Sequence, residues 1–401
     1  MNLQRPDEAA STVRTKDGRY YDLSKAALTH EGLTTLTDEQ FNQVLRNTRL
    51  RIAITPQCNL WCQYCSNEGL DYSTKKDKPG DIDLMIQLSQ MVLDNSPLTK
   101  IDFSGGEPLI HPDFTRGEYK LLNFLRMNPQ GKYSIHTNGV ELTEERVEQI
   151  IPVFSRIGVN VNSFSFQTWN SMTNRGGLCS PEAQRRKFEK LMRNLEYLST
   201  RGISERVFLK KVVMRGVNDS EEDLQYFLTK CLAYKFHPKF LEFEPQYPDQ
   251  KNLIVGRAEL FKKLEGLGCQ FPEDAPRHND ADTYIPGVNF KYGPADNQVT
   301  GLHSIFGCGT PGACASCYDF LCIFIKPDPE GKGLYVKPCS VMNKQIDLTA
   351  AIKSGDPAQV LKLIKQSREY LMLRPGLGTV GWNREKPYDP QVSPAGENKN
   401  G

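Results

Sequence analysis

The sequence contains no run of about 18 consecutive apolar residues, so it predicts no membrane-spanning helix. Its first residues also lack the basic segment followed by an apolar segment that marks a signal peptide. An excess of one charge sign is missing as well, because 50 Lys and Arg residues face 48 Asp and Glu residues. The net charge of +2 gives no field that favours a nucleic-acid polymer or a membrane surface as partner. We therefore expect a soluble, cytoplasmic protein with neither kind of partner.

Cysteine is the residue type whose number and arrangement stand out. The chain has 11 cysteines, and six of them gather in two short regions. In a reducing compartment, such groups are typical of metal ligands rather than of disulfides. We expect metal centres of this kind to be oxygen-sensitive.

The first group is the C-x3-C-x2-C run of Cys58, Cys62 and Cys65, which directly follows the apolar segment 51–55. Thiolates select iron–sulfur clusters, zinc or Cu(I), and a cubane cluster normally takes four of them. Three thiolates in one tight loop would leave one iron without a protein ligand. A structural zinc site is the alternative, but no fourth Cys or His follows within forty residues. The spacing therefore favours a 4Fe-4S cluster with one open iron.

Short apolar segments alternate with amphipathic segments from residue 50 to about 245, which is typical of repeated βα units and a parallel sheet. We expect strands at 50–55, 100–104, 132–136, 158–166, 206–214 and 239–243. We expect helices at 81–95, 114–127, 143–151, 181–200 and 219–234. The pattern predicts an α/β fold, a partial (β/α)6 barrel similar to a TIM barrel, with its reactive site at the carboxyl ends of the strands.

The rest of the chain divides by composition. We expect an N-terminal extension over 1–49, the barrel over 50–245, and a Pro- and Gly-rich linker over 246–305 with a short helix near 257–264. A small, β-rich, cluster-binding lobe is expected over 306–369, including a helix near 349–367 that Gly355-Asp356-Pro357 can split. Residues 370–401 are polar and Pro-rich and are expected to form a tail.

Two polar turns follow the second and third expected strands. The first is Ser104-Gly105-Gly106-Glu107-Pro108, in which the glycines let the backbone approach a ligand closely. The second is His136-Thr137-Asn138-Gly139, at the same edge of the sheet. Ordinary Gly-Gly and Asn-Gly turns are the alternative interpretation. Both turns lie at the carboxyl ends of their strands, where the reactive site is expected.

Polar residues also interrupt the last three expected strands. Ser163 on the fourth strand is a candidate ligand of a bound cofactor. Lys210 and Lys211 on the fifth strand and Lys239 on the sixth stand among apolar residues. Burying an ammonium without a partner is costly, so we expect one or more of these lysines to meet an anionic group at the site. An internal salt bridge, or a side chain that reaches solvent, is the alternative.

The second cysteine group is Cys314 and Cys317, in a C-x2-C turn, with Cys339 further along the chain. An auxiliary iron–sulfur cluster is plausible there. Either Cys308 or Cys322 could supply a fourth ligand, although Cys322 lies in an apolar run that favours a buried thiol. With four ligands the cluster would relay electrons; with three it could bind substrate.

Together these motifs are similar to those of radical S-adenosylmethionine (SAM) enzymes. Over most of residues 48–367 they resemble the GTP 3′,8-cyclase family of molybdenum-cofactor biosynthesis, at the cysteines of both groups and at 105–108, 137–139, 212–219 and 240–243. The resemblance implies two 4Fe-4S clusters and a SAM molecule whose amino and carboxylate groups chelate the open iron. It also implies reductive cleavage of SAM to a 5′-deoxyadenosyl radical, with an electron donor such as flavodoxin or ferredoxin.

The resemblance assigns roles to individual residues. The ligands of the first cluster, which are also the catalytic residues, would be Cys58, Cys62 and Cys65. The residues expected to bind SAM are Tyr64, Gly105, Gly106, Glu107, Pro108, Thr137, Asn138, Ser163 and Met214. Those expected to bind substrate are Lys211, Arg215 and Lys239. The ligands of the auxiliary cluster would be Cys314, Cys317 and Cys339.

Some family features are missing. Two arginines that follow the C-x2-C pair in the family and hold GTP phosphates are replaced here by Tyr318-Asp319-Phe320-Leu321, which cannot offer the same bidentate donors. The terminal Gly-Gly of the family is absent from the tail. We therefore expect a radical SAM enzyme that abstracts hydrogen from a small, sugar- or nucleotide-like substrate. A peptide maturase, a GTP 3′,8-cyclase, and a non-catalytic electron carrier or zinc-stabilised module are the alternatives.

Overall fold

The computed structural model describes eight stretches of the 401-residue chain. These stretches are 12–14, 20–22, 36–65, 77–243, 248–273, 287–304, 322–338 and 345–372. Among them, no helix has the length and apolar character needed to cross a membrane. The predicted ligands Cys314, Cys317 and Cys339, as well as Cys308, lie outside the described residues.

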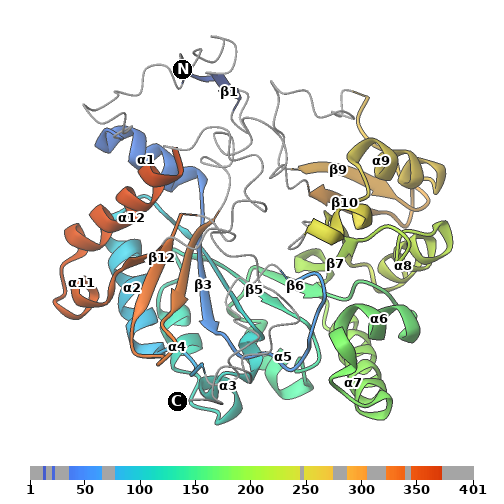
Figure 1. Ribbon diagram of the computed structural model, residues 1–401, viewed down its shortest axis with the longest axis horizontal. Helices are drawn as coiled ribbons and strands as arrows, with labels where there is room; N and C mark the ends of the chain where they lie inside the picture. The colour runs from blue at the N-terminus through green and yellow to red at the C-terminus, as the bar shows by residue number, and fades with distance from the viewer. Residues whose placement is uncertain are drawn as a thin grey trace, which may run out of the picture.

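One large, mostly parallel sheet organises the described residues. It has 11 strands in the order β13-β12-β11-β3-β4-β5-β6-β7-β8-β10-β9. The six parallel strands at its centre are β3 (Leu50–Thr55), β4 (Lys100–Gly105), β5 (Lys132–Thr137), β6 (Arg156–Asn160), β7 (Val207–Val213) and β8 (His237–Glu242). Figure 1 shows these strands along the inside of an open arc, with the helices outside it. The expected α/β fold, a partial barrel of six βα units, is confirmed.

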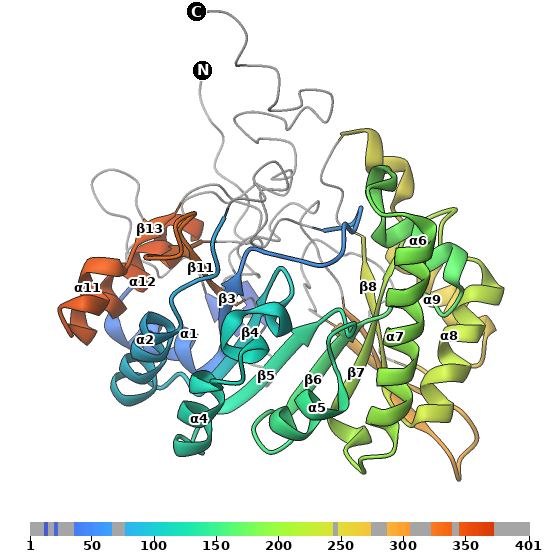
Figure 2. The ribbon, with the colours of Figure 1, turned by 90° about the horizontal axis from the view of Figure 1, so that it is seen from below.

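Helices cover the outer face of the arc, as Figure 2 shows for α2, α4, α5, α7 and α8. The helices up to the end of the barrel are α1 (Asp38–Asn47), α2 (Ile82–Asn95), α3 (Pro112–Thr115), α4 (Lys120–Met127), α5 (Glu144–Ile150), α6 (Phe166–Thr173), α7 (Pro181–Ser199) and α8 (Glu221–Tyr234). The later helices are α9 (Arg257–Gly266), α11 (Thr349–Lys353) and α12 (Pro357–Met372). The apolar core lies between these helices and the sheet, because alternate strand residues point outward to them.

Local sequence fixes most of the helix starts. The hydroxyls of Ser180 and Ser220 accept the backbone N–H groups of Ala183 and Asp223 at the starts of α7 and α8. Asp81 caps α2 in the same way. The expected helix over 114–127 is instead divided into α3 and α4, because Tyr119 takes a left-handed conformation with φ 49°. The split expected near Gly355 is confirmed between α11 and α12.

The fourth expected strand, over 158–166, is too long. β6 ends at Asn160, and α6 begins at Phe166. The backbone N–H groups of Val161 and Asn162 both point to the carbonyl of Lys210, and Asn162 has φ 62°. This turn breaks the alternation of a strand. Ser163 therefore lies in the loop after β6 rather than on the strand.

The ranges expected as linker and lobe both add strands to the main sheet. Strands β9 (Gly287–Tyr292) and β10 (Val299–Ser304) form a hairpin, and β10 pairs in parallel with β8. Strand β11 (Ile323–Pro327) pairs in parallel with β3 and antiparallel with β12 (Leu334–Lys337), which pairs with β13 (Ile346–Asp347). The described parts of 246–305 and 306–369 thus extend the barrel at its two edges, because an open sheet offers unpaired edge strands there. Outside this sheet, β1 (Thr12–Arg14) pairs with β2 (Tyr20–Asp22).

Candidate active site

Cys58, Cys62 and Cys65 lie on the loop that leaves the carboxyl end of β3. The end of α6 holds this loop through the backbone. Trp61 donates its N–H to the carbonyl of Thr173, and Gln63 donates to Met172, each at 2.9 Å. All three cysteines are half-buried. The loop is therefore fixed by the fold and does not depend on the cysteines alone for its shape.

Burial gives these thiols unusual acid–base properties. It raises the pKa of Cys58 to about 12 and that of Cys62 well above its usual value, and the neighbouring Glu107 and the other thiols act in the same direction. Because a metal binds the thiolate, iron would have to displace these protons. Among the described residues, no three Cys, His, Asp or Glu side chains are arranged to hold a single metal ion. A cubane cluster binds each thiolate through a different iron, so its ligands stand farther apart than those of one ion.

Two hydrogen-bond donors point at the sulfur of Cys58. The Leu60 N–H lies 3.5 Å from Cys58 Sγ, and Asn138 Nδ2 lies 3.8 Å from the same sulfur. Donors of this kind are typical around the thiolates of iron–sulfur clusters. The donor set therefore fits a 4Fe-4S cluster, with Cys58, Cys62 and Cys65 as the residues that would hold it.

The turn after β4 lies against the start of the cysteine loop. Gly106 donates its N–H to the carbonyl of Thr55 at 2.7 Å, and Glu107 donates to that of Gln57 at 2.8 Å. A Cβ on Gly105 or Gly106 would overlap the backbone of Thr55 or Gln57, and Gly105 has φ 136°. These glycines are thus needed for close approach of two chain segments. The contact of Gly105, Gly106 and Pro108 with SAM stays a prediction.

Glu107 joins this turn to the turn after β5. Its fully buried carboxylate accepts the Thr137 hydroxyl and the Asn138 N–H, both at 2.6 Å, and the Leu109 N–H at 3.1 Å. Burial raises the pKa of Glu107 to about 7 despite these three donors. Asn138 in turn donates to Asn59 Oδ1 at 2.7 Å. The predicted SAM-binding residues Glu107, Thr137 and Asn138 are therefore brought together beside the cysteine loop.

Ser163 and Lys211 meet at one carboxylate. The Ser163 hydroxyl donates to Asp223 Oδ1 at 2.5 Å, and the fully buried ammonium of Lys211 pairs with Asp223 Oδ2. Lys211 also donates to the carbonyl of Asn162 at 2.7 Å. Burial lowers the pKa of Lys211 to about 8, although Asp223 opposes this shift. The salt bridge weighed for the fifth-strand lysines is thus present for Lys211.

Two other predicted residues differ in exposure. Met214 is fully buried and packs with Met172, Phe243 and the ring of Tyr64. Arg215 is exposed, and its guanidinium binds both carboxylate oxygens of Glu259, at 3.0 and 2.6 Å. The structure therefore places Met214 beside the cysteine loop, while Arg215 is engaged on the surface.

A row of charged residues crosses the concave face of the barrel. Lys210 Nζ lies 2.6 Å from His136 Nδ1, and His136 Nε2 lies 3.2 Å from Asp102 Oδ2. Arg49 and Arg51 also approach Asp102, at 3.3 and 3.6 Å. Sequence analysis named Lys210 and His136 but did not identify Asp102, Arg49 or Arg51 as their neighbours. The signal was available, since Arg51 stands between Leu50 and Ile52, and Asp102 between Ile101 and Phe103.

Lys239 lies beside this row, because it pairs with Lys210 across β7 and β8. Among the described residues, no hydrogen bond or ion pair to its half-buried ammonium is found. Burial, together with the nearby Arg156, Arg51 and Arg49, lowers the pKa of Lys239 to about 7. Of the three predicted substrate ligands, Lys239 is the one with no hydrogen bond or ion pair among the described residues, although Asp102 is near enough to oppose the shift of its pKa.

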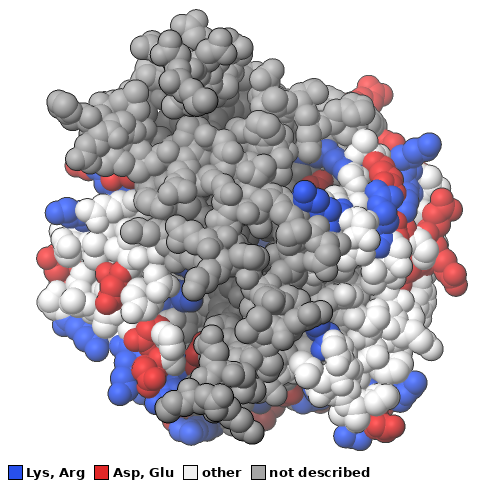
Figure 3. Space-filling view, viewed as in Figure 1, with Lys and Arg blue, Asp and Glu red and all other residues white. Residues whose placement is uncertain are grey.

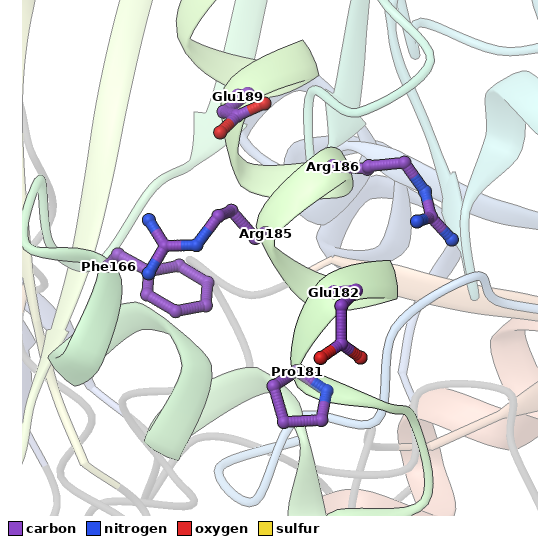
Figure 4. Close-up of a pocket in the computed structure, with 6 residues that line it drawn as sticks. All are labelled: Phe166, Pro181, Glu182, Arg185, Arg186 and Glu189. Carbon is purple, nitrogen blue, oxygen red and sulfur yellow. The ribbon is translucent and has the colours of Figure 1, made fainter.

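The molecular surface adds little to the site. Figure 3 shows Lys and Arg mixed with Asp and Glu over the described part of one face. A shallow hollow of about 400 Å³ lies against α7, where Arg185 stacks 4.2 Å from the centre of the Phe166 ring (Figure 4). Its lining residues are Phe166, Pro181, Glu182, Arg185, Arg186 and Glu189. It contains none of the predicted site residues.

Comparison with known proteins bears on this geometry. The family described as the Radical SAM superfamily matches residues 52–228. A GTP 3′,8-cyclase of Rippkaea orientalis is 27% identical over 340 residues, which cover 82% of this chain and 91% of that protein. A GTP 3′,8-cyclase of Lactiplantibacillus plantarum is 26% identical over 325 residues, covering 79% of this chain and 86% of that protein.

A solved structure titled "Native anSMEcpe with bound AdoMet" is 18% identical, with a TM-score of 0.49, covering 80% of this chain and 83% of that one. The family match spans the cysteine loop, both polar turns and Ser163, Lys211 and Met214. A match to this superfamily implies a 4Fe-4S cluster and SAM. The chain therefore carries a radical SAM domain over residues 52–228, and it resembles the GTP 3′,8-cyclases over most of its length.

Proposed function

We propose that the chain cleaves SAM reductively and abstracts hydrogen from a small polar substrate, as a step in the biosynthesis of a specialised metabolite or cofactor. The observation that supports this most is the set of three thiols on one fixed loop, with two hydrogen-bond donors at the sulfur of Cys58. When bound there, a 4Fe-4S cluster would supply the electron that converts SAM to methionine and a 5′-deoxyadenosyl radical. A flavodoxin or ferredoxin is the electron donor we expect.

The residues around the loop would bind and orient SAM. The Glu107 carboxylate holds the Thr137-Asn138 turn, and this turn lies against Asn59 and Cys58. Tyr64 and Met214 pack together on the other side of the loop. These contacts would keep the cofactor in one orientation and exclude water from it. Ser163, in the loop after β6, would also contact SAM.

The substrate would carry an anionic group. Lys239 is a half-buried ammonium without a partner among the described residues, and an anion from the substrate would balance its charge. Lys211 is already paired with Asp223, and Arg215 with Glu259, so these two are weaker candidates for direct contact. An auxiliary cluster on Cys314, Cys317 and Cys339 would hold the substrate or exchange a second electron. A fourth ligand from Cys308 or Cys322 would make it a relay.

A GTP 3′,8-cyclase is the second candidate. It is favoured by the identity of 27% over 82% of this chain to a protein of that name. The replacement of the two family arginines by residues of the run 318–321 speaks against it.

The test is anaerobic reconstitution with iron and sulfide, followed by dithionite and SAM, with 5′-deoxyadenosine measured by chromatography. We expect the wild type to form 5′-deoxyadenosine and Cys62→Ala to form none. Cys269→Ala is the matched control, because Cys269 is a buried thiol away from the loop and should leave the product unchanged. Equal amounts from the wild type and Cys62→Ala would refute the proposal.

Metal analysis separates the remaining alternatives. About eight iron atoms per chain would indicate two clusters and about four would indicate one, whereas zinc would indicate a structural module. If GTP is consumed with a stoichiometric yield of 5′-deoxyadenosine, the cyclase is correct. If GTP leaves the SAM turnover unchanged, a different substrate is required.

A further inference from the structure

The ammonium of Lys187 contacts the backbone of the cysteine loop. Lys187 lies in the second turn of α7 and is half-buried. Its Nζ donates to the carbonyl oxygen of Asn59, the residue after Cys58, at 2.7 Å, and it also lies 3.6 Å from Cys179 Sγ. Within the described stretches of the chain, no carboxylate forms an ion pair with it. The positive charge of Lys187 therefore acts on the loop without a neighbouring anion to neutralise it.

The peptide unit that Lys187 contacts also faces a cluster ligand. The N–H of Leu60 belongs to the same peptide unit as the Asn59 carbonyl, and it lies 3.5 Å from Cys58 Sγ. In a planar trans peptide, the carbonyl and the N–H point in opposite directions. Because Lys187 holds the carbonyl, the N–H points toward the sulfur. Hydrogen bonds in series polarise one another, so the cation on the carbonyl also makes this N–H a stronger donor.

Asn59 is held from a second side through its own side chain. The side-chain amide of Asn138 donates to Asn59 Oδ1 at 2.7 Å. The Oδ1 of Asn138 accepts the backbone N–H of Val140 at 3.0 Å, so its amide nitrogen faces Asn59 and lies 3.8 Å from Cys58 Sγ. The turn after β5 thus fixes the side chain of Asn59, while α7 fixes its backbone. These contacts limit rotation of the Asn59–Leu60 peptide.

Charge beside an iron–sulfur cluster changes the free energy of its reduction. A cluster gains one negative charge when it is reduced, so nearby cations and N–H donors stabilise the reduced state more than the oxidised state. The contact of Lys187 with the Asn59 carbonyl is partly buried. Solvent and salt therefore screen this charge less than they would screen one on the open surface.

We propose that Lys187 is a positioning residue that holds and polarises the Asn59–Leu60 peptide, directs its N–H onto the sulfur of Cys58, and thereby raises the reduction potential of the cluster. Groups that orient and polarise the surroundings of metal ligands tune a metal centre in this way. The proposal rests on the cluster assigned to the cysteine loop under the proposed function. It goes further by naming a residue on α7, outside that loop and the polar turns, that sets how easily the cluster gains its electron.

The test is a measurement of the midpoint potential of the reconstituted full-length chain, with the reduced cluster followed by electron paramagnetic resonance. The signal of this cluster is identified by its loss in Cys62→Ala. Lys187→Met keeps an unbranched apolar side chain and removes the charge, so we expect the potential to shift to a more negative value. Lys187→Arg keeps a cation and N–H donors for the Asn59 carbonyl, so it should restore most of the wild-type potential.

Lys190→Met is the matched control. Lys190 is also a half-buried lysine of α7, three residues further along, but its ammonium pairs with Glu141 at 2.9 Å. We expect no shift from this variant. A Lys187→Met protein with full iron content and the wild-type potential would overturn the proposal. So would a potential of Lys187→Arg as low as that of Lys187→Met, because charge would then not be the cause.

A second neutral variant, Lys187→Gln, covers the case in which Lys187→Met does not retain the cluster. We expect Lys187→Gln to shift the potential in the same direction as Lys187→Met. Loss of the cluster from both neutral variants, while their circular dichroism stays native, would overturn the proposal. Lys187 would then serve to retain the cluster and not to set its potential.

The outcome can be told apart from that of the proposed function. A wild type whose cluster titrates normally but forms no 5′-deoxyadenosine would refute the proposed function and leave this inference intact. The opposite result, normal 5′-deoxyadenosine formation with equal potentials in the wild type and Lys187→Met, would refute this inference alone.

Discussion

The carboxylate of Glu107, just after β4, accepts the backbone N–H of Asn138, just after β5, at 2.6 Å. Asn138 in turn donates to Asn59 in the cysteine loop, which follows β3. Three segments at the carboxyl ends of three adjacent strands are thus joined by one buried side chain. The shape of the candidate SAM site therefore depends on Glu107 even where Glu107 touches no ligand.

Replacing Glu107 by glutamine should destabilise the chain. The glutamine amide would place N–H groups where the carboxylate accepts three donors, leaving at least one buried donor unpaired. We expect the free energy of unfolding to fall by about 1–3 kcal/mol. Urea denaturation at pH 8 measures this, above the raised pKa of about 7 of Glu107, where the wild-type side chain is charged. Glu141→Gln is the control, since Glu141 pairs with Arg146 and Lys190 near the surface and should cost less than about 1 kcal/mol. Equal losses of unfolding free energy in Glu107→Gln and Glu141→Gln would contradict the role of Glu107 as the acceptor of three buried hydrogen bonds.

Gly158→Ala should disturb the row of charges on the concave face. β6 lies between β5 and β7, so the contact of His136 with Lys210 passes over Gly158. A Cβ there would lie 2.6 Å from Cε of Lys210 and 2.7 Å from Nδ1 of His136. We expect a loss of about 1–3 kcal/mol of unfolding free energy, from overpacking. Gly266→Ala at the end of α9 has open space and should be neutral or slightly stabilising, so a similar loss in both variants would contradict this explanation.

The stability conferred by Lys239 should depend on pH in a defined direction. Its folded pKa is lowered from 10.5 to about 7, so between these values the unfolded chain binds more protons than the folded chain, and stability rises with pH. Below pH 7 the penalty of the buried charge is fully present. We expect Lys239→Met to be more stable than the wild type by about 1–3 kcal/mol at pH 6, with the difference shrinking from pH 7 to pH 10. Thermal unfolding of the two proteins across this range measures it. If the stability difference between Lys239→Met and the wild type grows with pH, the prediction is contradicted.

The ion pair of Lys211 and Asp223 should be strongly coupled. Lys211→Met leaves the Asp223 carboxylate with the Ser163 hydroxyl but without its cation, and we expect it to cost about 3–5 kcal/mol. Adding Asp223→Asn should restore part of this loss, with a coupling of about 0.5–3 kcal/mol in a double-mutant cycle. Arg215→Met is the matched comparison, because its pair with Glu259 is exposed and should be worth at most about 1 kcal/mol. Additive losses for Lys211 and Asp223 would show that the pair does not act as a unit.

Much of the fold could be predicted from local sequence. The strands β3, β4, β5, β7 and β8 and the helices α2, α5, α7, α8 and α9 lie within a few residues of where apolar periodicity and capping residues place them. The cysteine loop, the Gly105-Gly106 turn and the Asn138 turn were also visible in the sequence, because each is a short run of neighbouring residues.

The remaining features depend on partners far apart in the chain. β6 ends early because Asn162 is held by Lys211, whose position next to it requires the pairing of β6 with β7. The edge strands β10 and β11 join the sheet by pairing with β8 and β3, which composition does not reveal.

The sequence by itself determined the chemistry: three thiols at cluster spacing after a strand, and polar turns where parallel strands end. Tertiary structure alone decided which charges are balanced. Lys211 meets Asp223, Lys210 meets His136 over Gly158, and Lys239 is left without a partner among the described residues. The physical reason is that the free energy of a buried charge depends on groups brought near it by folding, and these groups lie on other strands and helices.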